Sequence, residues 1–74
     1  MIHKIKFHSS DIDEISSIAN KYPHNVIHIA QGNKTINAKS YLGYSILDFE
    51  GEMMLIIQDT DDADILNAFS KWFI

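Results

Sequence analysis

The chain has 74 residues and a formal net charge of −4, from ten acidic and six basic side chains. It contains no cysteine, which excludes disulfides, thiolate nucleophiles and cysteine-based zinc sites. All six basic residues are lysines, so arginine-based nucleic-acid readout and the guanidinium clamp of a phosphoryl-transfer site are both missing. The length predicts one domain over residues 1–74. No segment is apolar enough to span a membrane and no leader is visible, so we expect no membrane association and a cytoplasmic location.

The first elements along the chain are a strand and a helix. Apolar and polar residues alternate over residues 2–8, with Ile5 and Phe7 on the side that faces the core. A helix is predicted to begin at Ser10, which stands at capping-box spacing from Asp13. Its apolar positions recur at helical spacing as far as Tyr22, and the helix is expected to end near residue 21 because proline follows at residue 23.

The remaining elements are a hairpin, a helix, a strand and a last helix. Residues 25–31 and 34–38 read as two strands joined by a turn at Gly32 and Asn33. Residues 39–47 predict a short helix, residues 53–58 a central apolar strand, and residues 59–73 a helix anchored by Trp72 and Phe73.

This order, β-α-β-β-α-β-α, predicts an α+β fold. A four-stranded antiparallel sheet would be covered on one face by three helices, and its other face would be open to water. The residues expected to lie on the open face are all polar: Lys4, Lys6, His28, Lys34 and Asn37.

Residues 32–47, Gly-Asn-Lys-Thr-Ile-Asn-Ala-Lys-Ser-Tyr-Leu-Gly-Tyr-Ser-Ile-Leu, resemble the HPr family of histidine-containing phosphocarriers in the bacterial sugar phosphotransferase system. The matching positions are Lys34, Ile36-Asn37, Lys39-Ser40, Gly43 and Leu47. The resemblance extends to the order of elements over essentially the whole chain. It implies an HPr-like open-faced sandwich and a place in the phosphotransferase system.

The sequence departs from the family at the phosphorylated histidine. In HPr proteins this histidine lies at the start of the first helix, within a signature that also contains glycine, arginine and proline. His8 can be aligned with it, but those three residues are absent and Asp11, Asp13 and Glu14 follow. Because carboxylates repel a phosphoryl group, the sequence predicts that phosphohistidine transfer has been lost. A divergent phosphocarrier that uses His8 is the alternative.

The second predicted helix carries the other candidate site. Ser40 is expected to cap this helix. The resemblance adds a regulatory phosphorylation site, because the matching serine of many HPr proteins is phosphorylated by a dedicated kinase. The family also binds its partners through exposed apolar residues of this helix, which makes Lys39, Ser40, Tyr41, Leu42 and Tyr44 the candidate protein-binding residues. Alternatively, Tyr44 and Leu47 belong to the core.

No metal, cofactor or catalytic site is predicted. The acidic residues 59–64 lack the spacing of a calcium loop and suit the start of a helix, and the four histidines show no ligand spacing. No serine has a recognisable base beside it. We therefore expect a non-catalytic regulatory or adaptor module whose partner is a protein, such as a kinase or a transcriptional regulator. The remaining alternative is a self-associating module that forms a homodimer through its open sheet face or a strand edge.

Overall fold

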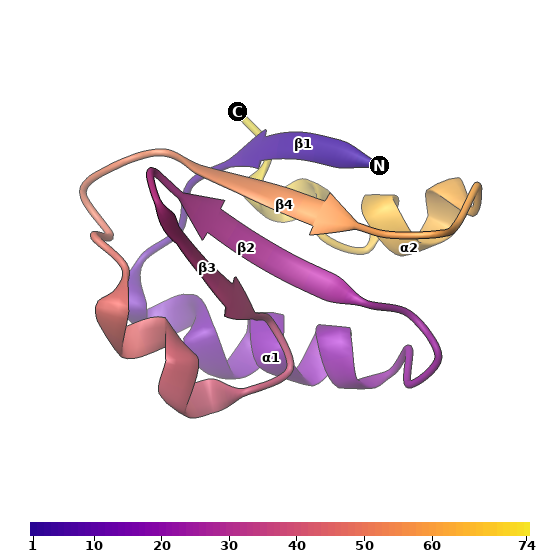
Figure 1. Cartoon of the computed structure of the whole chain (residues 1–74), viewed down its shortest axis with the longest axis horizontal. Coiled ribbons are helices and arrows are strands. Elements are labelled where there is room, and N and C mark those ends of the chain that lie inside the picture. The colour runs from indigo at the N-terminus through magenta and orange to yellow at the C-terminus, as the bar shows by residue number, and fades with distance from the viewer.

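A computed structural model describes all 74 residues and confirms the predicted α+β fold (Figure 1). The four strands are β1 (Ile2–Ile5), β2 (Ile27–Gln31), β3 (Lys34–Asn37) and β4 (Met53–Ile57). The two α-helices are α1 (Ile12–Asn20) and α2 (Ala63–Asn67), and three further segments form 3₁₀ helices, η1 (Ser9–Asp11), η2 (Tyr41–Ile46) and η3 (Ser70–Trp72).

The strands form one antiparallel sheet in the order β1-β4-β2-β3. The strand predicted to be central, β4, pairs with β1 on one side and β2 on the other. The β2–β3 hairpin turns at Gly32 and Asn33, and Gly32 has a φ of 59°, which glycine adopts without steric cost. The topology places the first and last strands side by side. The C-terminal residues also return to β1, so both ends of the chain lie near this strand (Figure 1).

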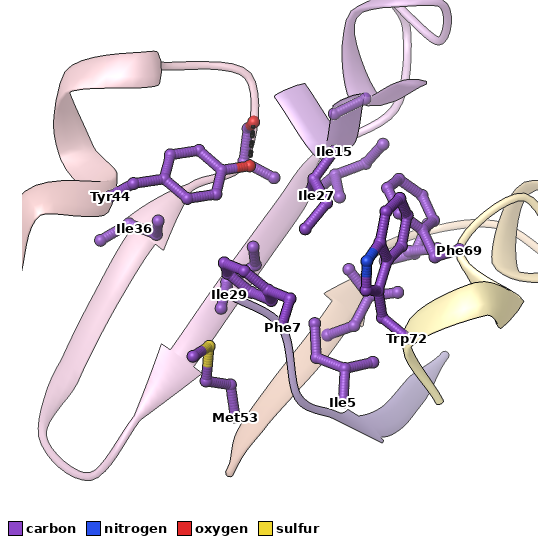
Figure 2. Packing of buried hydrophobic residues seen from close by; sticks show 14 of the residues in the cluster. Ile5, Phe7, Ile15, Ile27, Ile29, Ile36, Tyr44, Met53, Phe69 and Trp72 are labelled. Carbon is purple, nitrogen blue, oxygen red and sulfur yellow. Dashed lines mark hydrogen bonds between the residues drawn. The ribbon is translucent and has the colours of Figure 1, made fainter. Parts of the chain in front are cut away.

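One hydrophobic core lies between the sheet and the helices (Figure 2). Alternate strand residues point into it, and α1 and the C-terminal segment close it from the other side. All sixteen buried residues are hydrophobic, and the largest fully buried side chains include Tyr44, Phe7, Phe69, Ile5 and Ile15. Each such side chain stabilises the fold by roughly 1.5–3 kcal/mol relative to its exposed state.

The predicted last helix is shorter than expected and is interrupted. α2 covers only five residues, and η3 follows it before the chain becomes extended at Phe73. The reason is pairing with β1: the Lys6 amide donates to the Trp72 carbonyl at 3.0 Å, and the Ile74 amide donates to the Lys4 carbonyl at 3.1 Å. These backbone bonds require extended residues, so the helix ends, and they cover the outer edge of β1.

The prediction of an entirely polar open face is wrong in two respects. Lys34 has the same alternation as the buried Ile36 and points to the helical side, where its ammonium donates to the Ile46 carbonyl at 3.0 Å. Conversely, Met54 and Ile56 alternate with the buried residues of β4 and therefore lie on the open face. The centre of the open face is thus apolar.

Candidate protein-binding surface and the histidine at the first helix

The connection from β3 to η2 is held by backbone and amide hydrogen bonds around Asn37. The Asn37 side-chain oxygen accepts from the Lys39 amide at 3.0 Å, and its carbonyl accepts from the Ser40 amide at 2.9 Å. Asn20, the last residue of α1, donates its side-chain amide to the Lys39 carbonyl at 3.1 Å. The start of η2 is therefore fastened to the C-terminal half of α1.

Ser40 is the residue that precedes η2, as predicted, but its hydroxyl does not cap the helix. The Ser40 carbonyl, and not its hydroxyl, accepts from the Gly43 amide, at 3.1 Å. The exposed side chain of Ser40 makes no hydrogen bond to the protein. The hydroxyl is accordingly accessible at the surface.

Exposed apolar side chains follow Ser40 directly. Tyr41 is 56% exposed, Leu42 83% and Ile46 50%. Ile46 was not among the residues expected at this surface, although it lies four positions after Leu42 on the same short helix. We call Ser40, Tyr41, Leu42 and Ile46 the η2 surface.

Tyr44 does not belong to the η2 surface, which corrects its prediction as a binding residue. Its side chain is fully buried, and its hydroxyl donates to the Ala38 carbonyl at 2.7 Å (Figure 2). Leu47 is buried as well, so the alternative assignment of both residues to the core is correct. The two are three positions apart, which is one turn of a 3₁₀ helix, and therefore share its inner side.

Lys39 has a structural role that the sequence did not indicate. Its ammonium donates to the carbonyl oxygens of Tyr22 at 2.7 Å and of Asn25 at 2.5 Å. The side chain therefore ties the α1–β2 loop to the end of β3, and its charged group points into the protein instead of toward a partner on the η2 surface.

His8 immediately precedes the first helical turn, the position that the resemblance assigns to a phosphorylated histidine. It replaces Ser10 as the residue that caps this turn: the His8 carbonyl accepts from the Asp11 amide at 2.9 Å, and the His8 amide donates to Asp11 Oδ2 at 3.0 Å. His8 is exposed. The carboxylate of Asp11 thus places a negative charge at the helix start, where a phosphoryl group on His8 would need hydrogen-bond donors.

His8 and Ser40 lie toward opposite ends of α1. His8 precedes the start of the helix, and Ser40 is fastened through Lys39 to Asn20 at its end. At about 1.5 Å per residue the intervening helix separates them by on the order of 15 Å, so neither residue takes part in chemistry at the other.

The acidic segment before α2 has an ordinary structural explanation. Asp62 Oδ1 accepts from the Asp64 amide at 2.9 Å and caps the helix. No group of three or more histidine, aspartate or glutamate side chains in the chain could hold a metal ion. None of the helices is long and apolar enough to cross a membrane.

No protein-family model matches the chain, and a comparison with curated proteins found no match. Solved structures do match in fold. HPr-C-His from Thermoanaerobacter tengcongensis superimposes with a TM-score of 0.75 at 22% identity, over 96% of this chain and 85% of that one. The phosphocarrier protein HPr from Bacillus anthracis strain Ames gives a TM-score of 0.75 at 18% identity, over 100% and 96% of the two chains.

A third similar structure is the catabolite repression protein Crh of Bacillus subtilis, described as an intertwined dimer with a swapped domain. Its TM-score is 0.65 at 24% identity, over 86% of this chain and 75% of that one. The class of fold is therefore an open-faced α+β sandwich. More particularly, it is the HPr-like fold, as the resemblance of residues 32–47 implied.

Proposed function

We propose that this HPr-like chain is one regulatory or adaptor domain that binds a protein partner through the η2 surface and does not carry phosphohistidine. The observation that carries the proposal is the exposure of Leu42, Tyr41 and Ile46 beside an accessible serine hydroxyl. Exposed large apolar side chains that adjoin one another are typical of protein-binding sites. The partner is a protein such as a kinase or a transcriptional regulator, in the cytoplasm.

Phosphorylation of Ser40 would give this surface a switch. A phosphate adds close to two negative charges next to Tyr41 and Leu42, and the first amides of η2 can donate to it. The hydroxyl is accessible and makes no hydrogen bond that modification would break. Crh, one of the proteins with a similar structure, is described as a catabolite repression protein, which fits a regulatory role for this fold.

The arrangement at His8 supports the absence of phosphohistidine transfer. The Asp11 carboxylate already accepts the amide of His8, and Asp13 and Glu14 follow in the first turn of α1. The only cation that pairs with these acids is the exposed Lys71, whose ammonium contacts Glu14 Oε1 at 2.9 Å. Its pKa is raised by Glu14 and, to a smaller extent, by the charge of Asp11. A phosphoryl group on His8 would therefore face three carboxylates and a single ammonium, which is a net negative charge.

Mass spectrometry after two phosphorylation reactions tests both sites. The chain is incubated with phosphoenolpyruvate and the phosphotransferase enzyme that phosphorylates HPr, and separately with ATP and the serine kinase that acts on HPr. We expect no acid-labile phosphate in the first reaction. In the second we expect an acid-stable phosphate that is lost in Ser40→Ala and kept in Ser45→Ala. An acid-labile phosphate that disappears in His8→Ala would contradict the proposal.

The η2 surface is tested with the same kinase as the probe partner. We expect Leu42→Ser to raise the KM of the kinase for this chain several-fold, because the substitution removes exposed apolar contact area without touching the core. Ile74→Ser is the matched control, since Ile74 is also exposed but lies at the C-terminus, away from η2. Equal effects of the two substitutions, or none from Leu42→Ser, would remove the η2 surface from the proposal.

Two other functions are each supported by specific observations. A divergent phosphocarrier is favoured by the position of His8 directly before the first helix, and the first reaction above decides it. A self-associating module is favoured by Ile2, Met54 and Ile56 on the open sheet face and by the dimer described for Crh. Sedimentation of the chain at high concentration decides that function, because a purely monomeric chain would exclude it.

A further inference from the structure

The molecule has one hollow of appreciable size, with a volume of about 170 Å³. It lies where the α1–β2 loop meets the start of β2 and the exit from β3. The loop contributes Pro23, His24, Asn25 and Val26, and the strands and their exits contribute Ile27, His28, Asn37 and Lys39.

The polar groups that line the hollow are all neutral or basic. The side chains of the lining residues include two imidazoles, two amides and one ammonium group, and no carboxylate is among them. This is notable in a chain with ten acidic residues and a net charge of −4. Every one of these five groups can donate a hydrogen bond, so the lining suits an anionic ligand with several acceptor oxygens.

Lys39 is the strongest donor in this lining. Its partly buried ammonium uses two of its three hydrogens on the carbonyl oxygens of Tyr22 and Asn25. It has no carboxylate partner, since the two ion pairs of the molecule are Lys4–Glu52 and Lys71–Glu14. A partly buried charge with only neutral partners is incompletely compensated, and an anion in the hollow would complete its coordination.

The acidic segment that follows β4 begins beside the α1–β2 loop. The Gln58 amide donates to the Val26 carbonyl at 3.0 Å, and Asp59 comes next. Asp59 is exposed and does not line the hollow, so the immediate surroundings of Lys39, His24 and His28 remain free of carboxylates.

We propose that this hollow is a binding site for a small oxyanion, a phosphate or carboxylate group, held by Lys39, His24, His28 and Asn37. The anion accepts from the remaining hydrogen of the Lys39 ammonium and from the imidazoles and amides around it. The site goes beyond the proposed partner binding, because the η2 surface contributes none of its lining residues.

Nuclear magnetic resonance of the ¹⁵N-labelled chain tests the site, with sodium phosphate, sodium acetate and sodium chloride added at equal ionic strength. We expect saturable shifts of the backbone signals of His24, Asn25, His28 and Lys39 with phosphate, with acetate or with both. Which of the two salts saturates identifies the preferred anionic group. Chloride is expected to give no saturable shift. Equal shifts with chloride, or no saturation with either oxyanion, would overturn the proposal.

Variants separate the hollow from the overall charge of the chain. Because Lys39 also holds the α1–β2 loop, the test rests on His24→Gln combined with His28→Gln, which is expected to weaken binding by about threefold or more. Lys6→Gln removes a positive charge outside the hollow and should leave binding unchanged. Binding that survives the double histidine substitution, or that falls equally in Lys6→Gln, would also overturn the proposal.

Discussion

The hydroxyl of Tyr44 donates a 2.7 Å hydrogen bond to the carbonyl oxygen of Ala38, inside a core whose other residues are all apolar (Figure 2). Ala38 is the residue at which the chain leaves β3, and Tyr44 lies in η2, so the bond fastens the 3₁₀ helix to the sheet. It leaves no buried side-chain polar atom without a partner. The η2 surface is displayed on the other side of the same short helix.

Tyr44→Phe is expected to destabilise the fold by about 1–2 kcal/mol, because the Ala38 carbonyl loses its buried donor while the ring volume is retained. The free energy of unfolding in urea measures this cost. If the variant is as stable as the wild type, the hydrogen bond does not contribute to the attachment of η2.

The same residue predicts a dependence of stability on alkaline pH. Burial raises the pKa of the Tyr44 hydroxyl above its usual range. The folded state therefore keeps this proton when the unfolded state releases it, above pH ~10. The contribution of the Tyr44 hydroxyl to stability is complete below that pH and falls as the pH rises further. Unfolding in urea at several pH values between 8 and 11 should show a steeper decline above pH 10 for the wild type than for Tyr44→Phe, and parallel curves would refute this.

Gln31 is expected to stabilise the loop before β4. Its side-chain amide donates to the Asp48 carbonyl at 2.7 Å and to the Glu52 carbonyl at 3.3 Å, and its oxygen accepts from the Asp48 amide at 2.7 Å. Gln31→Ala should cost about 1–2 kcal/mol in thermal or urea unfolding. Thr35→Ala, on the neighbouring strand, is the control, and an equal loss there would argue against a specific role for Gln31.

A double substitution tests the same contact from the other side. A Cβ atom added at Gly51 would lie 3.1 Å from Gln31 Nε2, so Gly51→Ala should displace that amide and destabilise the wild type. In the Gln31→Ala background the same change should cost much less. Additive effects would show that the two residues are not coupled.

Removal of residues 72–74 is expected to unfold the chain. Trp72 is buried, and its loss alone costs about 3–5 kcal/mol, which is most of the stability of a small domain. The deletion also removes the backbone bonds to Lys4 and Lys6 and exposes the edge of β1. Circular dichroism should show loss of the cooperative thermal transition. Deletion of Ile74 alone keeps Trp72 and should leave the transition in place. A cooperative transition in the longer deletion would contradict the prediction.

Asp59 has a φ of 56° and is the only residue other than glycine in the left-handed region. Asp59→Val should destabilise the chain by about 1–2 kcal/mol, because a β-branched side chain is strained there. Asp59→Gly should be tolerated. Asp61→Val, two positions along in the same loop, serves as the control. The unfolding midpoints of the variants measure the effect. Equal midpoints for Asp59→Val and Asp61→Val would contradict the prediction.

The sequence by itself determined the order of the elements and the fold, but not the extent of the last helix. Alternation in residues 4–8 and 35–38, helical spacing from Ile12 to Ala19, and the apolar run at β4 are local patterns, and local patterns are set by which residues must face the core. Residues 32–47 added the HPr-like arrangement, which the structural comparisons confirm. The accessible position of Ser40, Tyr41 and Leu42 also followed from the sequence.

Only the tertiary structure decided the features that depend on contacts between distant segments. Tyr44 is a core residue because the Ala38 carbonyl at the end of β3 accepts from its hydroxyl. The Lys39 ammonium points inward because the α1–β2 loop presents two carbonyl acceptors to it. The last helix ends because the following residues pair with the edge of β1. The hollow around His24, His28 and Lys39 exists only where these segments converge. Local periodicity does not predict such contacts. A hydrogen bond or a hollow is formed by two or more segments that are far apart in the sequence, and a local pattern describes only one of them.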